Sequence, residues 1–170
     1  MAFFDFIKSA GEKLFSSKDS EAAATEMAAK PDDAAVKAKA DASNRAAGDA
    51  IEAYVKAQNL SATALTVTFN GATGTATVFG VAADQPTKEK ILLCCGNVGG
   101  VSKVDDKMTV EVAEPQATFY TVVSGDNLSK IAKQHYGDAN KYPVIFEANK
   151  PMLKHPDKIY PGQVLRIPPK

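Results

Sequence analysis

The 170-residue sequence has few of the side chains on which enzymatic and structural metal sites usually depend. It contains two histidines, His135 and His155, and neither stands in a motif beside a nucleophile, which argues against a hydrolytic triad. Its two cysteines, Cys94 and Cys95, are adjacent, so they lack the Cys-x-x-Cys spacing of zinc and redox sites and make a poor disulfide. The sequence therefore predicts a binding protein rather than an enzyme, in a reducing compartment.

Net charge and long apolar runs are also absent. The 20 basic and 20 acidic residues balance, so no global field would draw the chain to nucleic acid. No apolar run approaches the roughly 18–20 residues needed to cross a bilayer, and the N-terminus lacks the basic region and long apolar stretch of a signal peptide. We therefore expect a cytoplasmic monomer with no nucleic-acid partner and no stable membrane insertion.

Two segments precede the more regular part of the chain. Residues 1–17 place apolar side chains at helical spacing, which predicts a short amphipathic helix. The apolar positions are Phe3, Phe6, Ile7, Ala10 and Leu14. Residues 18–40 consist mainly of Ala, Ser, Lys, Asp and Glu, with almost no large apolar side chain to offset the ordering entropy. This segment is predicted to be a linker or a loosely held helix.

Residues 41–113 carry the pattern of a small α+β domain. Their periodicities predict, in order, a helix over 41–55, strands over 65–69 and 75–79, a helix over 86–96 and a strand over 101–112. Asn70-Gly71 supplies the hairpin turn between the first two strands. The αββαβ order, the glycine after the second strand and the sequence Val-Gly-Gly-Val…Val-Asp-Asp before and within the last strand resemble a BON domain.

Residues 114–118 form a short linker, and residues 119–170 follow as a second unit. A strand from Tyr120 leads into a Gly-Asp turn and a helix, a second helix covers 144–149, and a strand returns over 159–168. This βααβ order resembles a LysM domain. The resemblance implies binding of N-acetylglucosamine polymers, with peptidoglycan as the bacterial ligand. The implied glycan groove lies at Gly125, Asp126, Asn149, Pro151 and Tyr160.

The turn Gly96-Asn-Val-Gly-Gly100 is the strongest candidate for an ion site. Because it follows a helix, it presents the carbonyl oxygens of a helix C-terminus, which attract cations. The same glycines are also explained by a simple helix cap. From the residues alone, both interpretations stay open.

The combination of these units resembles a family of bacterial cytoplasmic potassium-binding proteins. The resemblance extends to the N-terminal sequence Phe-Phe-Asp-Phe-Ile-Lys-Ser-Ala-Gly-Glu-Lys-Leu. It implies that backbone carbonyls bind K⁺, with Rb⁺ and Cs⁺ as further candidates, and that the ion favours a compact arrangement of the two domains. The implied ligands are the carbonyls of Ile7, Ala10, Glu12, Gly96, Val98 and Val101. The alternative is an envelope protein that attaches to peptidoglycan through LysM.

Overall fold

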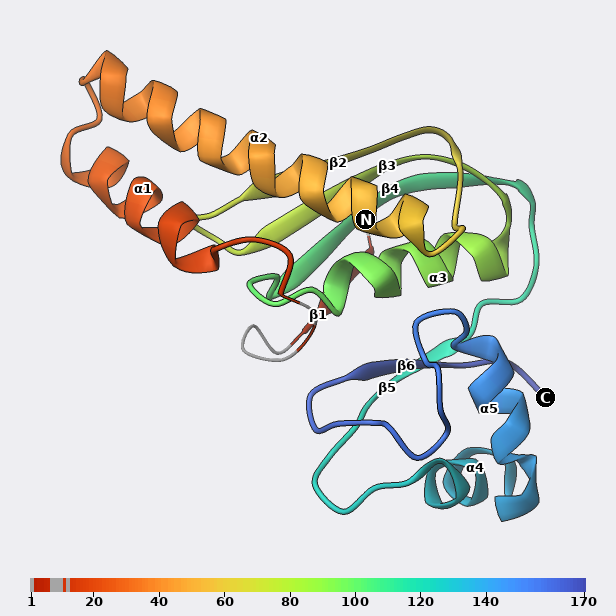
Figure 1. Ribbon diagram of the computed structural model, residues 1–170. Coiled ribbons are helices and arrows are strands. Elements are labelled where there is room, and N and C mark those ends of the chain that lie inside the picture. The colour runs from red at the N-terminus through yellow and green to blue at the C-terminus, as the bar shows by residue number, and fades with distance from the viewer. Residues whose placement is uncertain (1, 7–10, 12) are drawn as a thin grey trace.

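The computed structural model describes residues 2–6, 11 and 13–170, and it contains a mixed-sheet unit followed by a smaller unit (Figure 1). The elements of the mixed-sheet unit are β1 (Ala2–Asp5), α1 (Ser17–Ala29), α2 (Ala34–Ala57), β2 (Thr63–Asn70), β3 (Thr75–Asp84), α3 (Gln85–Gly96) and β4 (Lys103–Val112). From α2 onward this is the predicted αββαβ order. The α+β fold expected from the sequence is therefore confirmed.

The four strands lie in the order β1-β4-β3-β2. Strands β2 and β3 form the predicted antiparallel hairpin, whereas β3 and β4 are parallel and are joined through α3. Helices α2 and α3 lie side by side on the sheet (Figure 1). Their buried side chains, such as Ile51 and Ile91, pack with Val78 and Val104 from the strands to form one core. This packing fixes the end of α3, where the candidate turn begins.

The prediction of a helix at the N-terminus is wrong for the part of it that the structure describes. Residues Ala2–Asp5 form β1, an antiparallel strand paired with β4. Without β1, the edge of β4 would expose a row of unpaired backbone N–H and C=O groups. A short apolar segment can pair with such an edge as a strand even when its apolar residues also fit the spacing of a helix. Tertiary pairing therefore decided the conformation of this segment.

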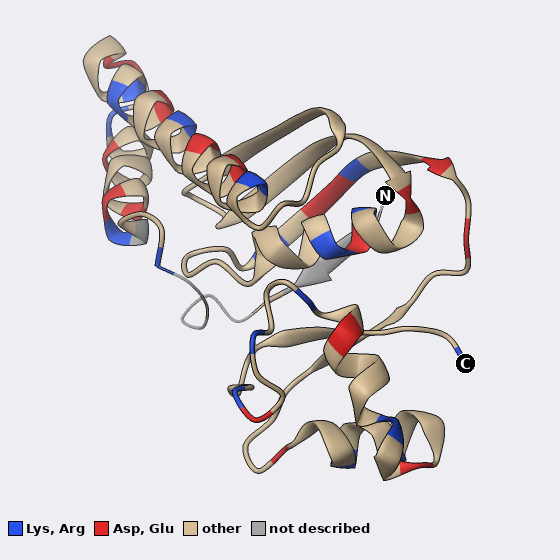
Figure 2. Ribbon diagram, turned by 45° about the vertical axis from the view of Figure 1, so that its right-hand side comes forward, with Lys and Arg blue, Asp and Glu red and all other residues tan. Residues whose placement is uncertain are grey.

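Residues 18–40, predicted as a linker or a loosely held helix, are helical apart from the α1–α2 connection. Helix α1 follows an N-cap in which the Ser16 side chain accepts from Asp19 N–H, and α2, capped by Asp33, runs without a break from Ala34 to Ala57. The two helices pack through small side chains, with Ala23, Ala24 and Ala40 buried. Charges of both signs are distributed along their surfaces (Figure 2). The sequence predicts a loosely held segment because it is rich in alanine. In the structure the same small side chains let α1 and α2 pack closely as a helical hairpin.

The second unit contains β5 (Thr118–Thr121), α4 (Leu128–Tyr136), the 3-10 turn η1 (Ala139–Lys141), α5 (Tyr142–Ala148) and β6 (Val164–Ile167). Strands β5 and β6 pair antiparallel, and the two helices pack on them around Ile131, Ile145 and Leu165. Helix α4 ends at Gly137 in the left-handed conformation. The predicted βααβ order is confirmed. Across the described residues, no helix is both long and apolar enough to cross a membrane.

Both cysteines of α3 are fully buried. Burial raises the pKa of the Cys94 thiol to about 12, and it raises the pKa of Cys95 well above its usual value. Because the thiolate is the reactive form, we expect neither thiol to react with a soluble disulfide reagent at pH 8 in the folded protein. Both should react within seconds after denaturation. Fast labelling of one thiol in the native protein would show that α3 opens locally.

Candidate functional site

The turn that follows α3 is rigidly held at both ends. Asn97 N–H donates to the Leu93 carbonyl at 2.9 Å as the helix ends, and Val101 N–H donates to the Val98 carbonyl at 3.1 Å. The side chains of Val98 and Val101 are fully buried and anchor the turn in the core. Local sequence explains this shape, since Gly100 has a φ of +103°, a conformation that glycine adopts readily. The turn therefore presents a backbone of fixed shape.

The N-terminal chain contacts this turn at two points. Leaving β1, Phe6 N–H donates to the Ser102 carbonyl at 2.9 Å, and the Phe6 ring lies against Gly96 so closely that a Cβ there would overlap it. Gly11, with a φ of +108°, lies against the Asn97 carbonyl, and a Cβ on Gly11 would overlap that oxygen. Strand β1 thus carries the N-terminal chain onto the turn.

The sequence-predicted ion ligands divide into two groups. Gly96 is the last residue of α3, and Val98 and Val101 lie in the turn described above. Ile7, Ala10 and Glu12 lie outside the described residues. Phe6 and Gly11, which flank most of this second group, both contact the turn.

The chemistry of this region favours a cation bound by neutral oxygens. A helix C-terminus carries a partial negative charge on its last carbonyls. The described part of the chain contains no group of three or more His, Cys, Asp or Glu side chains that could hold a metal ion. Hard divalent cations prefer such carboxylate-rich cages, whereas a large monovalent cation is well matched by backbone carbonyls. Gly11 brings the backbone of the N-terminal chain against the Asn97 carbonyl of this turn, and neutral backbone oxygens are the kind of ligand that suits a potassium ion.

The same turn also holds the second unit. The Asn97 side chain donates to the Val164 carbonyl and accepts from Val164 N–H, both at 3.0 Å. Since Val164 is the first residue of β6, the Asn97 amide completes the hydrogen bonding of that strand as a neighbouring backbone would. Sequence reasoning missed this contact, because a turn asparagine carries no signal of a partner 67 residues away.

A buried ion pair forms a second connection between the units. Arg166 Nε lies 2.6 Å from Glu89 Oε2, and the two side chains are only 7% and 2% exposed. Glu89 also accepts from the Gln85 side chain and from Ala117 N–H, both at 2.9 Å. Sequence reasoning missed this pair too. The available signal was the position of Glu89 three residues before the buried Leu92, on an apolar face of α3.

The residues implied for a glycan groove are mostly engaged within the second unit. Asp126 accepts from Tyr120 Oη and Val123 N–H, both at 2.9 Å, and the Gly125 carbonyl accepts from Lys130 Nζ at 2.7 Å. The hydrogen bond that the Tyr120 phenol donates to Asp126, more than burial, raises the pKa of that phenol.

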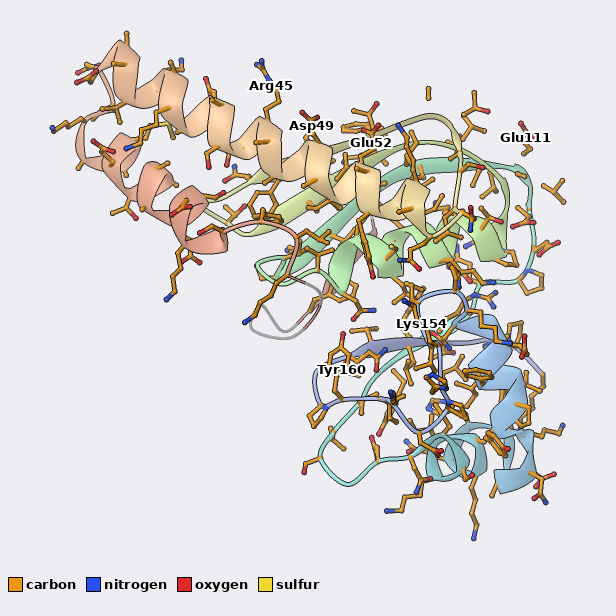
Figure 3. All side chains as sticks on the ribbon, viewed as in Figure 1. Arg45, Asp49, Glu52, Glu111, Lys154 and Tyr160 are labelled. Atoms are coloured by element: carbon orange, nitrogen blue, oxygen red, sulfur yellow. The ribbon has the colours of Figure 1, made fainter. Side chains whose placement is uncertain are left out.

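The remaining three groove residues lie in different surroundings. Asn149 is 2% exposed, and its amide bonds the backbone of Ile145 and Arg166. Pro151 follows a cis peptide bond, and Tyr160 lines a cleft that faces α2. Figure 3 labels Tyr160 and Lys154 at the side of the second unit that faces the mixed-sheet unit. The structure thus leaves the Asn149 amide without free donors for a sugar.

Comparisons with known proteins give one match to the second unit and one to nearly the whole chain. Residues 120–168 match the LysM domain family. The chain is 45% identical over 168 residues to the potassium binding protein Kbp of Escherichia coli, and the match covers 99% of each chain. A partial match, 40% identical over 74 residues, joins 41% of the chain to 16% of an esterase of Mycobacterium tuberculosis. An uncharacterized protein of Deinococcus radiodurans is 53% identical over 51 residues, 30% of this chain and 19% of its own length.

Proposed function

This chain belongs to the family of the potassium binding protein Kbp, and from that premise we propose that it binds potassium selectively in the cytoplasm, as an ion sensor or buffer. The observation that carries the proposal is the contact of Gly11 with the Asn97 carbonyl, which brings the N-terminal chain onto the turn after α3. The proposed ligands are the carbonyls of Ile7, Ala10, Glu12, Gly96, Val98 and Val101. No catalytic step is proposed.

Selectivity for potassium would come from backbone shape. A ring of carbonyl dipoles replaces the hydration shell of a large, weakly hydrated cation at low cost. Smaller ions such as sodium hold water more strongly and need a tighter ring. Because Val98 and Val101 are anchored in the core, the turn has limited freedom to contract around a smaller ion.

The ion would also favour the docked arrangement of the two units. Asn97 lies in the proposed potassium turn, and its side chain bonds Val164 of the second unit. Ordering the N-terminal chain against the turn would therefore stabilise the same residue that holds β6. Binding of potassium and docking of the units are coupled in this proposal, so each should strengthen the other.

Thermal unfolding in matched salts tests the proposal. A ligand at 100 times its dissociation constant stabilises the folded state by about 2.7 kcal/mol, which corresponds to a rise of roughly 5–10 °C in Tm for a chain of this size. We expect this rise in potassium chloride and not in sodium chloride at equal ionic strength. Rubidium and caesium chlorides should give intermediate shifts. Equal rises in Tm in all of these salts would mean that ionic strength alone causes the stabilisation, and would contradict the proposal.

The LysM match supports one second function, which is attachment to peptidoglycan. Sedimentation of the purified protein with insoluble peptidoglycan tests it, with the protein alone as the control for aggregation. We expect most of the protein to stay in the supernatant, because the Asn149 amide is fully used inside the second unit. Saturable pelleting that soluble chitin fragments reverse would favour glycan binding instead.

A further inference from the structure

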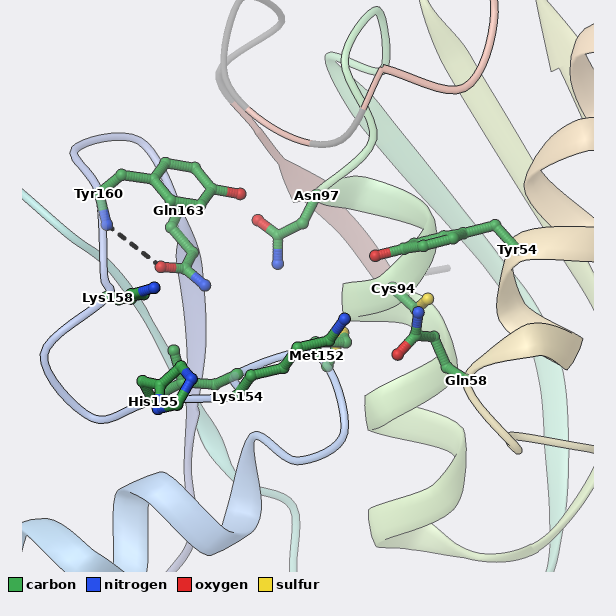
Figure 4. Close-up of a pocket in the computed structure, with 11 residues that line it drawn as sticks. Tyr54, Gln58, Cys94, Asn97, Met152, Lys154, His155, Lys158, Tyr160 and Gln163 are labelled. Carbon is green, nitrogen blue, oxygen red and sulfur yellow. Dashed lines mark hydrogen bonds between the residues drawn. The ribbon is translucent and has the colours of Figure 1, made fainter.

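A cleft of about 280 Å³ lies between the two units, and its lining includes Asn97 of the proposed potassium turn but none of Gly96, Val98 and Val101. Tyr54 of α2 and Gln58, which caps that helix, line one side, and the loop before β6 contributes Lys154, Lys158 and Tyr160. Figure 4 shows Tyr54 and Tyr160 on opposite sides of the cleft, with both hydroxyl groups directed toward Asn97. Interfaces between structural units are common places for small-ligand sites.

The charge of this cleft is of one sign. Its lining includes Lys154, His155 and Lys158, and it includes no aspartate or glutamate. Neither lysine takes part in an ion pair among the described residues. Two ammonium groups held in one concave surface focus a positive potential there. The cleft is therefore suited to an anion.

Two uncharged side chains of the cleft, Gln163 and Asn97, also present donors. The side-chain oxygen of Gln163 accepts from Tyr160 N–H at 3.3 Å (Figure 4). The side-chain NH₂ group of Gln163 is therefore the end of this amide that can donate to a ligand. The Asn97 carbonyl oxygen accepts from Val164 N–H, and only one of its two amide hydrogens is used by the Val164 carbonyl. Such a lining matches a ligand rich in acceptor oxygens.

We propose that this cleft binds a small phosphate-bearing anion. Phosphate oxygens accept several hydrogen bonds at once, and charge-assisted bonds from Lys154 and Lys158 would be stronger than those between neutral groups. Asn97 of the mixed-sheet unit and Gln163 of the second unit would supply neutral donors. Because these donors come from both sides of the cleft, the anion would hold the docked arrangement together. The site does not depend on potassium for its ligands.

Titration calorimetry of the full chain tests this site with two probes, inorganic pyrophosphate and adenosine monophosphate, in magnesium-free potassium chloride. We expect saturable binding of at least one probe with one site per chain. Tighter binding of pyrophosphate would identify an inorganic or polyphosphate ligand. Tighter binding of the nucleotide would indicate that its base also contacts a tyrosine ring. A repeat in sodium chloride keeps this result separate from the proposed potassium site.

A charge-matched pair of variants decides whether the cleft is the site. The double variant Lys154→Gln/Lys158→Gln should lose at least tenfold in affinity. The control Lys133→Gln/Lys141→Gln changes the net charge by the same amount at exposed positions outside the cleft lining, and it should bind within twofold of the unsubstituted chain. All four substitutions are at exposed lysines, so folding is expected to be preserved. Absence of binding to both probes, or equal losses in the two double variants, would overturn the proposal.

Discussion

Replacing Arg166 by alanine is expected to destabilise the chain by about 3–5 kcal/mol, since removal of one partner leaves the other charge buried without compensation. Glu89, only 2% exposed, would lose its partner at 2.6 Å. The backbone hydrogen bond from Arg166 N–H to Asn149 at 2.7 Å is retained in this variant, so strand β6 keeps its own support. Urea unfolding monitored by circular dichroism measures the change.

Two controls separate the buried pair from ordinary charge loss. In the double variant Glu89→Leu/Arg166→Leu both charges are gone, and we expect most of the lost stability to return, because apolar replacement of a buried pair is often neutral. Lys39→Ala removes the exposed pair between Lys39 and Glu26, and the unfolding midpoint should hardly change. If Arg166→Ala unfolds at the same urea concentration as Lys39→Ala, the ion pair between the units does not stabilise the folded chain.

The order of elements was predictable because it depends on local patterns. The hairpin around Asn70-Gly71 and the helix from Pro86 to Gly96 each follow from residue spacing and turn chemistry. Strand β1 was not predictable in this way. Phe3 and Phe6 fit a helical spacing, and only the open edge of β4 makes the strand the better solution.

The contacts between the units could not be read from the sequence for a different reason. Glu89 and Arg166 are 77 residues apart, and Asn97 and Val164 are 67 residues apart. Neither pair leaves a periodic signal, because each arises only after both units have folded. The glycines of the turn were visible in the sequence, whereas the contact of Gly11 with Asn97 requires the path of β1. The family resemblance supplied the expectation that these two segments meet.

Substitution of Gly11 by alanine is expected to remove the potassium-dependent rise in Tm. The φ of +108° at Gly11 disfavours any side chain, and a Cβ would overlap the Asn97 carbonyl oxygen and lie 3.1 Å from Gly99 N. Both atoms belong to backbone, so neither can move aside as a side chain would. The N-terminal chain would therefore separate from the turn, and the proposed ion site would lose the half supplied by that chain. Tm measured in potassium and in sodium chloride gives the difference.

Gly137→Ala is the matched control, because it separates backbone strain from lost contact with the turn. Gly137 has a φ of +80°, yet no heavy atom beyond its two chain neighbours lies within 4 Å of the Cβ that alanine would add. This variant should lose about 1 kcal/mol of stability in both salts through its backbone conformation alone. In Gly137→Ala the rise in Tm from sodium to potassium chloride should equal that of the unsubstituted chain, whereas in Gly11→Ala it should be small or absent. If Gly11→Ala keeps the full increment, potassium is bound away from the junction of the N-terminal chain and the turn, and the ligand set proposed here is wrong.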